Sequence, residues 1–196
     1  MQKWMFIRTG PFENIYIYDN WVERVYKGFY SQFPSATIVN LHIEGNQFYN
    51  TAKGHKNHLG SGINLIEILG GDVGGGARSR DVVIQNNKIE ARTHEGPMDA
   101  PSGRISGCQK STVRGMLNVS SMDGFTIEGN LFLQDSDGAK IGANNGIVLG
   151  SQLRNGTVTG NTLTNIKGSP EVLGSQPNSV EIQNTVNTQN LPNNCN

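Results

Sequence analysis

The stretch "FTIEGNLFLQ", residues 125–134, decides the fold, because a closely similar stretch, "LHIEGNQFYN", occupies residues 41–50. In both stretches polar and apolar residues alternate, a Gly-Asn pair follows, and a second apolar position comes after it. Alternation predicts a β-strand with one buried face, and Gly and Asn are the residues that best tolerate left-handed backbone in a tight turn. Each stretch therefore predicts a strand, a turn and a second short strand.

Related segments recur along most of the chain, and each contains the alternating strand followed by the turn. They are residues 14–22, 40–48, 81–89, 124–132, 155–163 and 179–187. The central apolar residue of each segment is expected to point inward: Ile17, Ile43, Ile84, Ile127, Val158 and Ile182. Because no such unit can bury its apolar face alone, repeats at this period indicate units that stack on one another.

A resemblance to a known family rests on the segment "NNGIVLGSQLRNGTVTGNTLTNI", residues 144–166, and on the repeated turns. This pattern resembles a coil of the right-handed parallel β-helix, or pectin-lyase-like, superfamily, of the phage tailspike or polysaccharide-degrading type. The resemblance extends over residues 13–190 and implies an all-β fold, a right-handed single-stranded parallel β-helix of about six to eight coils. An antiparallel β-sandwich is the alternative, but two-residue hairpin turns between matched strands are absent from the sequence.

The resemblance also implies that the asparagines of successive turns stack as a ladder. The positions that match it are Asn20, Asn46, Asn87, Asn130 and Asn161. In the last repeat the aligned residue is Thr185, which suggests a last coil that frays.

Length and charge restrict the possibilities further. The 196 residues suit one domain, 1–196, which is either a complete β-helix domain or a fragment of a longer β-helix. Lys plus Arg and Asp plus Glu number 16 each, so no overall charge points to nucleic acid or to a membrane. No signal peptide is visible, and the resemblance implies an extracellular or virion location.

Outward-pointing residues next to the central Ile form candidate binding and catalytic groups. Glu44 and Glu128 are expected two strands apart, at roughly 10 Å, with Gln85 between them. Inverting glycosidases separate their two carboxyl groups by about 6.5–9.5 Å, so we predict Glu44 and Glu128 as a catalytic pair with His42 as a helper. Tyr18 and Gln85 would contact substrate. Solvated glutamates on an exposed strand face are the competing interpretation.

Three insertions are predicted to form loops beside this surface, near residues 50–62, 70–80 and 91–121. The last one contains His94, Arg104, Lys110 and Arg114, which could bind an acidic sugar chain. A cation or base among them would also suit β-elimination of a uronate, although any long polar loop contains such residues. Neither cysteine has metal-ligand spacing, and we expect no metal and no cofactor.

Aromatic residues cluster near the start of the chain, where they either cover the first repeat or offer faces on which sugars stack. They are Tyr16, Tyr18, Trp21, Tyr26, Phe29 and Tyr30.

The sequence thus leads to two functional hypotheses. The first is a β-helix that binds a neutral or acidic polysaccharide and cleaves it as a hydrolase or lyase. The alternative is a noncatalytic structural or adhesive β-helix, such as a virion fibre or a cell-surface component. Open ends of a stack of strands need cover, so a homotrimer or partner subunits at the ends are also expected.

Overall fold

The chain folds into β-strands that pair in parallel. The computed structural model describes residues 3–7, 10–23, 27–31, 36–50, 66–69, 78–91, 115–134, 145–150, 152–164, 171–172 and 180–187. The described residues contain no helix, and therefore none that is long and apolar enough to cross a membrane. Every strand pair is parallel.

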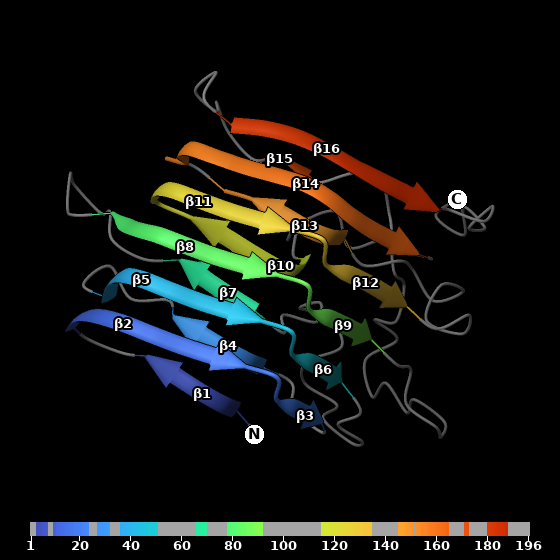
Figure 1. Cartoon of the computed structure of the whole chain (residues 1–196), viewed down its shortest axis with the longest axis horizontal. Coiled ribbons are helices and arrows are strands. Elements are labelled where there is room, and N and C mark those ends of the chain that lie inside the picture. Colours follow the sequence, from blue (N-terminus) through green and yellow to red (C-terminus); the bar gives the residue numbers. More distant parts are fainter. Residues whose placement is uncertain are drawn as a thin grey trace, which may run out of the picture.

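Two sheets contain all the described strands (Figure 1). The first sheet has six strands in the order β1 (Lys3–Ile7), β4 (Lys27–Ser31), β7 (Ile66–Leu69), β10 (Gly115–Ser120), β13 (Asn145–Leu149) and β15 (Glu171–Val172). The second sheet has two arms that meet in the long strand β14 (Arg154–Thr164). One arm contains β2 (Gly10–Tyr18), β5 (Ala36–Glu44), β8 (Ser79–Gln85), β11 (Met122–Glu128) and β16 (Val180–Asn187), and the other contains β3 (Trp21–Glu23), β6 (Gln47–Asn50), β9 (Lys88–Ala91) and β12 (Leu131–Gln134).

The chain visits these sheets in a fixed order, so each repeat unit has one strand from the first sheet and then one from each arm of the second. The successive units are β1–β3, β4–β6, β7–β9, β10–β12, β13–β14 and β15–β16. Each unit pairs residue by residue with the next one, for example Ile43 with Ile84 and Ile84 with Ile127. The stacking of repeats expected from the sequence is therefore present, and the antiparallel alternative is wrong.

The core is made of columns of inward side chains, one residue from each unit. The residues expected inward in β2, β5, β8, β11 and β14 are at most 4% exposed: Ile17, Ile43, Ile84, Ile127 and Val158. The short arm adds a second column of buried residues: Val22, Phe48, Ile89, Phe132 and Leu163.

Although Trp4 and Phe6 on the edge strand β1 are 38% and 40% exposed, the middle of the first sheet is buried on both faces. Its inward residues include Phe29, Ile66 and Leu117, all 0% exposed, while Glu67 and Asn118 on the opposite face are 4% and 6% exposed. The outer side chains that reach solvent therefore lie mainly on the second sheet.

Left-handed residues mark the corners of each unit. One set lies in register inside the long arm and has φ between 48° and 73°: Asn14, Asn40, Asp81, Gly124 and Asn155. A second set opens the turn between the two arms, with φ between 54° and 67°: Asp19, Gly45, Asn86, Gly129 and Gly160. Only Gly, Asn and Asp adopt this backbone at low energy, which explains why these residue types recur at the turns.

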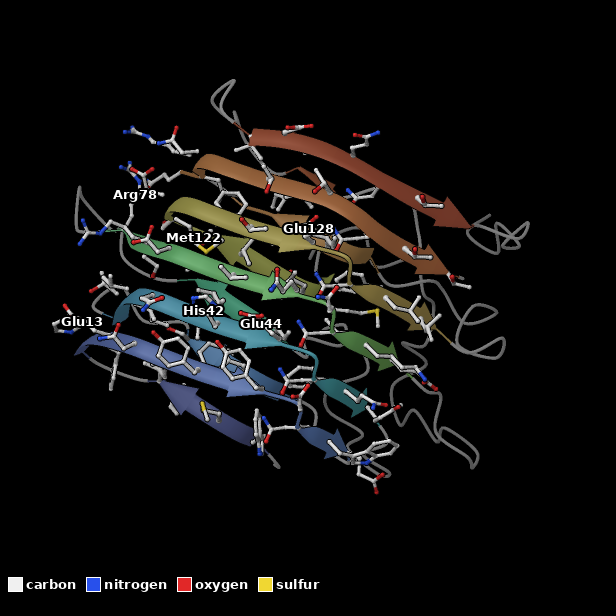
Figure 2. The ribbon with its side chains drawn as sticks, in the orientation of Figure 1. Glu13, His42, Glu44, Arg78, Met122 and Glu128 are labelled. Atoms are coloured by element: carbon white, nitrogen blue, oxygen red, sulfur yellow. The ribbon has the colours of Figure 1, made fainter. Side chains whose placement is uncertain are left out.

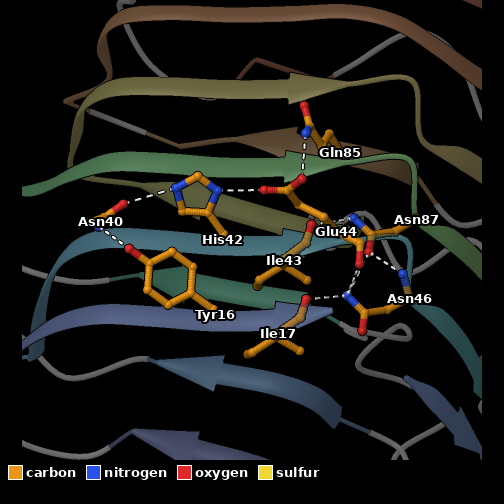
Figure 3. A network of polar contacts seen from close by, with 9 residues as sticks. All are labelled: Tyr16, Ile17, Asn40, His42, Ile43, Glu44, Asn46, Gln85 and Asn87. Carbon is orange, nitrogen blue, oxygen red and sulfur yellow. Dashed lines mark hydrogen bonds and ion pairs between the residues drawn. The ribbon is translucent and has the colours of Figure 1, made fainter. Parts of the chain in front are cut away.

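The asparagine after each turn forms the predicted ladder. The Asn46 Nδ2 donates to Asn87 Oδ1 at 3.0 Å, and the Asn46 backbone N donates to the same oxygen at 2.9 Å. Asn46 Nδ2 also donates to the carbonyl oxygen of Ile17 at 2.8 Å. Figure 3 shows this step of the ladder, from Asn46 to Asn87. The pattern repeats through Asn87, Asn130 and Asn161, so amides that are at most 1% exposed keep their hydrogen-bond partners.

The last repeat differs from the sequence-based prediction in two respects. Asn184, and not Thr185, continues the ladder, since Asn161 Nδ2 donates to Asn184 Oδ1 at 2.7 Å. The pairing of β14 with β16 shifts between Thr159 and Thr162, and this irregularity brings Asn184 into line. Ile182, expected inward, is 41% exposed because no described strand pairs with the other edge of β16.

All three predicted loops include strand residues, and the segment near 50–62 begins with Asn50, the last residue of β6. The segment near 70–80 contains the first residues of β8, and the segment near 91–121 contains the whole of β10. Residues 117–120 of β10 do alternate between apolar and polar, but this strand lies in a long polar segment and no Gly-Asn turn of the kind that marks the other repeats follows it. Arg78, Ala91 and Ser121 are also described, whereas residues 51–62, 70–77 and 92–114 lie outside the described residues.

Replacing a central asparagine of the ladder should lower the free energy of unfolding more than replacing the first one. Asn87→Ala removes the acceptor of two Asn46 donors and both side-chain donors of Asn87. Each unsatisfied buried group costs about 1–3 kcal/mol, so the free energy of unfolding should fall by about 3 kcal/mol or more. Asn20→Ala, at the partly exposed first position, should cost about 1 kcal/mol. Urea denaturation of both variants measures this, and equal losses would contradict the ladder's role.

A close approach in the core can be tested by a double-mutant cycle. A Cβ placed on Gly156 would lie 2.1 Å from the Phe125 ring, which occupies that space. Gly156→Ala should therefore lower the free energy of unfolding by about 2 kcal/mol through overpacking. In a Phe125→Leu background the same change should cost much less, because the ring is gone. If thermal unfolding shows that the two substitutions lower the free energy of unfolding additively, the two residues do not compete for this space.

Candidate functional site

The outer face of the long arm carries the residues selected from the sequence. Register pairs Tyr18 with Glu44, Glu44 with Gln85, and Gln85 with Glu128. Glu44 and Glu128 thus lie two strands apart with β8 between them, which corresponds to roughly 10 Å (Figure 2). The predicted order of these residues on neighbouring strands is present.

Glu44 accepts hydrogen bonds at both carboxylate oxygens. Gln85 Nε2 donates to Oε2 at 2.6 Å, and Oε1 lies 2.5 Å from His42 Nδ1 (Figure 3). The side chain of Glu44 is 22% exposed, whereas Glu128 is exposed. Gln85 therefore extends toward Glu44 from the strand that separates the two carboxylates.

His42 lies between two oxygen acceptors. Its Nε2 is 3.0 Å from Asn40 Oδ1, while the Asn40 Nδ2 donates to Asn14 Oδ1 and to the Tyr16 hydroxyl, both at 2.7 Å. Whichever ring nitrogen of His42 carries a proton can donate to the oxygen that it faces. The contacts connect residues of β2, β5 and β8 into one polar network on the outer face.

Two tyrosines stand beside this network and reach solvent. Tyr16 and Tyr18 are 52% and 46% exposed, with ring centroids 6.0 Å apart. The Tyr16 ring stacks on the His42 ring at 5.2 Å with an interplanar angle of 30°, and Tyr18 meets His42 edge to face at 6.4 Å. We call Tyr16, Tyr18, His42, Glu44 and Gln85 the outer aromatic surface.

The hydroxyl of Tyr18 on this surface has a pKa above the ordinary tyrosine value. Desolvation is the largest cause that raises the pKa of Tyr18, and the neighbouring Glu44 carboxylate and the Tyr16 side chain raise it further. Tyr18 therefore remains a neutral hydrogen-bond donor at neutral pH.

Sequence reasoning missed part of this arrangement. Asn40 was not selected from the sequence, and Tyr16 was considered only as a member of the aromatic cluster near the start, although both belong to the strands that carry Tyr18 and His42. Strand register was the signal that could have identified these residues, because Tyr16 pairs with His42 and Asn14 pairs with Asn40. The basic residues predicted to bind an acidic sugar, His94, Arg104, Lys110 and Arg114, lie outside the described residues. Among the residues that are described, no cluster of His, Cys, Asp and Glu could hold a metal ion.

Comparison of the chain with models of protein families, with curated proteins and with solved structures finds no match. Function must therefore be inferred from the surface itself.

The link between Tyr18 and Glu44 predicts a measurable change in titration. Glu44→Gln removes one of the charges that raise the pKa of Tyr18, so this pKa should fall but stay above the ordinary tyrosine value, because desolvation remains. Ultraviolet difference titration against a Tyr18→Phe reference isolates this residue. Glu128→Gln is the matched control, two strands away from Glu44, and should leave the Tyr18 titration unchanged. An unaltered pKa in Glu44→Gln would contradict the contact.

Proposed function

We propose that this chain is a right-handed parallel β-helix of the pectin-lyase-like type that binds a polysaccharide across its outer aromatic surface. Its parallel, in-register repeats and its asparagine ladder support the β-helix. The observation that carries the binding function is the pair of solvent-exposed rings, Tyr16 and Tyr18, packed against His42 on a hydrogen-bonded sheet.

The chemistry of this surface suits a sugar chain. A pyranose ring has apolar C–H faces and a rim of hydroxyl groups, so it needs aromatic faces together with hydrogen-bonding groups. Tyr16 and Tyr18 offer ring faces and hydroxyls, while Glu44 and Gln85 offer a carboxylate and an amide beside them. An extended sheet surface also suits a polymer better than a small ligand, which usually binds in a concave pocket.

The positions of these groups are held before a ligand arrives. Tyr16 is hydrogen-bonded to Asn40, and His42 lies between Asn40 and Glu44. Side chains that are already restrained lose little conformational entropy on binding, so more of the contact energy appears as affinity. A polysaccharide ligand would agree with an extracellular or virion location.

Hydrolysis by Glu44 and Glu128 is the second candidate function, and the register of these residues favours it. Their separation of roughly 10 Å is close to the range in which a water fits between an acid and a base. Against it, both Glu44 oxygens already have hydrogen-bond partners, and Gln85 lies on the strand between the carboxylates. Binding without cleavage, as in an adhesive β-helix, therefore fits the geometry better.

Titration of the purified chain with neutral and uronate-containing polysaccharides tests binding. Tyr16→Ala and Tyr18→Ala should each weaken binding of the recognised polymer about tenfold, because each removes an exposed stacking face. Thr157→Ala is the matched control, since Thr157 continues the outer row of Tyr16 and His42 on β14, away from the rings. Equal affinities for all four proteins would contradict the proposed surface, and so would the absence of binding to every polymer.

The same polymers separate binding from cleavage. Hydrolysis by the pair would release reducing ends, and Glu44→Gln or Glu128→Gln should lower that rate about a hundredfold or more. Unsaturated products would instead indicate β-elimination by residues outside this pair. Binding with no product of either kind would leave the adhesive function alone.

A further inference from the structure

A second group of aromatic and charged side chains lies on the short arm, around the corner from the outer aromatic surface. Trp21 on β3 and Tyr49 on β6 have ring centroids 4.6 Å apart at an angle of 34°. Lys88 on β9 places its Nζ 5.2 Å from the Tyr49 ring centroid. The three residues come from successive paired strands, and register places Trp21 and Lys88 in the row of Gln47 while Tyr49 lies two residues further along β6. They therefore form a diagonal column along the stack of units.

Each member of this column is held by a polar neighbour on its own strand. Trp21 Nε1 donates to Glu23 Oε2 at 3.1 Å, and the Tyr49 hydroxyl donates to Gln47 Oε1 at 2.7 Å. Lys88 Nζ lies 3.0 Å from Glu90 Oε2. The hydrogen bond to Glu90 is the main cause that raises the pKa of Lys88, which therefore stays charged.

Exposure differs sharply along the column. Tyr49 is only 3% exposed, whereas Trp21 at its end is 61% exposed. The indole is thus supported on one side by a buried ring and its cation, and much of its remaining surface meets solvent. A large aromatic group that is restrained and still exposed is well suited to bind a flat ligand face.

The column lies close to the first surface along the chain. Tyr18 and Trp21 are three residues apart, so their Cα atoms are separated by about 11 Å at most. The residue between them that belongs to the ladder, Asn20, donates to Asn46 Oδ1 at 2.9 Å and so fixes the turn. The two aromatic groups therefore have a defined relative position that a short oligosaccharide could span.

We propose that Trp21 forms a second sugar subsite, in which a neutral pyranose ring of the same polysaccharide stacks on the indole beside Glu23 and Gln47. A neutral sugar fits because Lys88 is paired with Glu90, whereas Glu23 places a carboxylate at the indole edge that would repel a uronate. This subsite rests on the proposed function, since it adds a contact to the polymer bound at Tyr16 and Tyr18.

The chain offers a direct spectroscopic test, because it contains two tryptophans, Trp4 and Trp21. Trp4→Phe leaves Trp21 as the single indole fluorophore. Titration of this variant with neutral gluco-, manno- and galacto-oligosaccharides, from disaccharide to hexasaccharide, should shift the Trp21 emission once the ligand is long enough to span both surfaces. A Trp21→Ala variant should bind those longer oligosaccharides about tenfold more weakly and the shortest ones equally well.

Controls separate the subsite from the proposed function and from loss of folding. Trp21→Tyr should retain most of the affinity, and Thr162→Ala, on the same outer row at the opposite end, should retain all of it. Oligosaccharide binding that depends on Tyr16 but leaves the Trp21 emission and the Trp21→Ala affinity unchanged would overturn the subsite alone. No binding of any oligosaccharide or polysaccharide would overturn both proposals. Self-association without sugar that shifts the emission would show that Trp21 contacts a second copy instead.

Discussion

The column of buried asparagine amides is the interaction on which the rest of the structure depends. Each amide from Asn46 to Asn161 donates to the next Oδ1 and to a carbonyl oxygen of the preceding unit, so polar groups in a dry interior remain satisfied. A unit that slipped by one residue would leave these groups without partners, at a cost of about 1–3 kcal/mol each. The ladder therefore sets the register between units as well as the shape of each turn.

Register in turn determines which side chains meet on the surface. Gln85, which is far from Glu44 in sequence, lies beside it only because their units stack without a shift. The same constraint aligns Trp21 with Gln47 and Lys88 on the other side of the turn, so that Tyr49 on the middle strand contacts both Trp21 and Lys88 diagonally. Both candidate sugar contacts are thus consequences of a polar interaction inside the protein and not of the surface residues alone.

The exposed aromatic residues of the described part of the chain concentrate in its first unit. Those on β1–β3 are Trp4, Phe6, Phe12, Tyr16, Tyr18 and Trp21. Large exposed apolar groups gathered in one region usually mark a surface that binds something. In this region the rings on the second sheet have polar neighbours, which favours an amphipathic ligand such as a sugar over a purely apolar one.

The sequence by itself determined the repeat, the inward Ile and Val column, most of the asparagine ladder and the order of Glu44, Gln85 and Glu128, because these follow from local alternation and turn chemistry. Only the tertiary structure decided that Asn184 ends the ladder, since an irregularity in the pairing of β14 with β16 is not visible in either strand alone. It likewise decided that β10 is a strand, because the alternation over residues 117–120 is short and no Gly-Asn turn follows it. The hydrogen bonds that occupy Glu44, and the support of Trp21 by Tyr49, also required the structure, because they depend on which side-chain conformations neighbouring units allow.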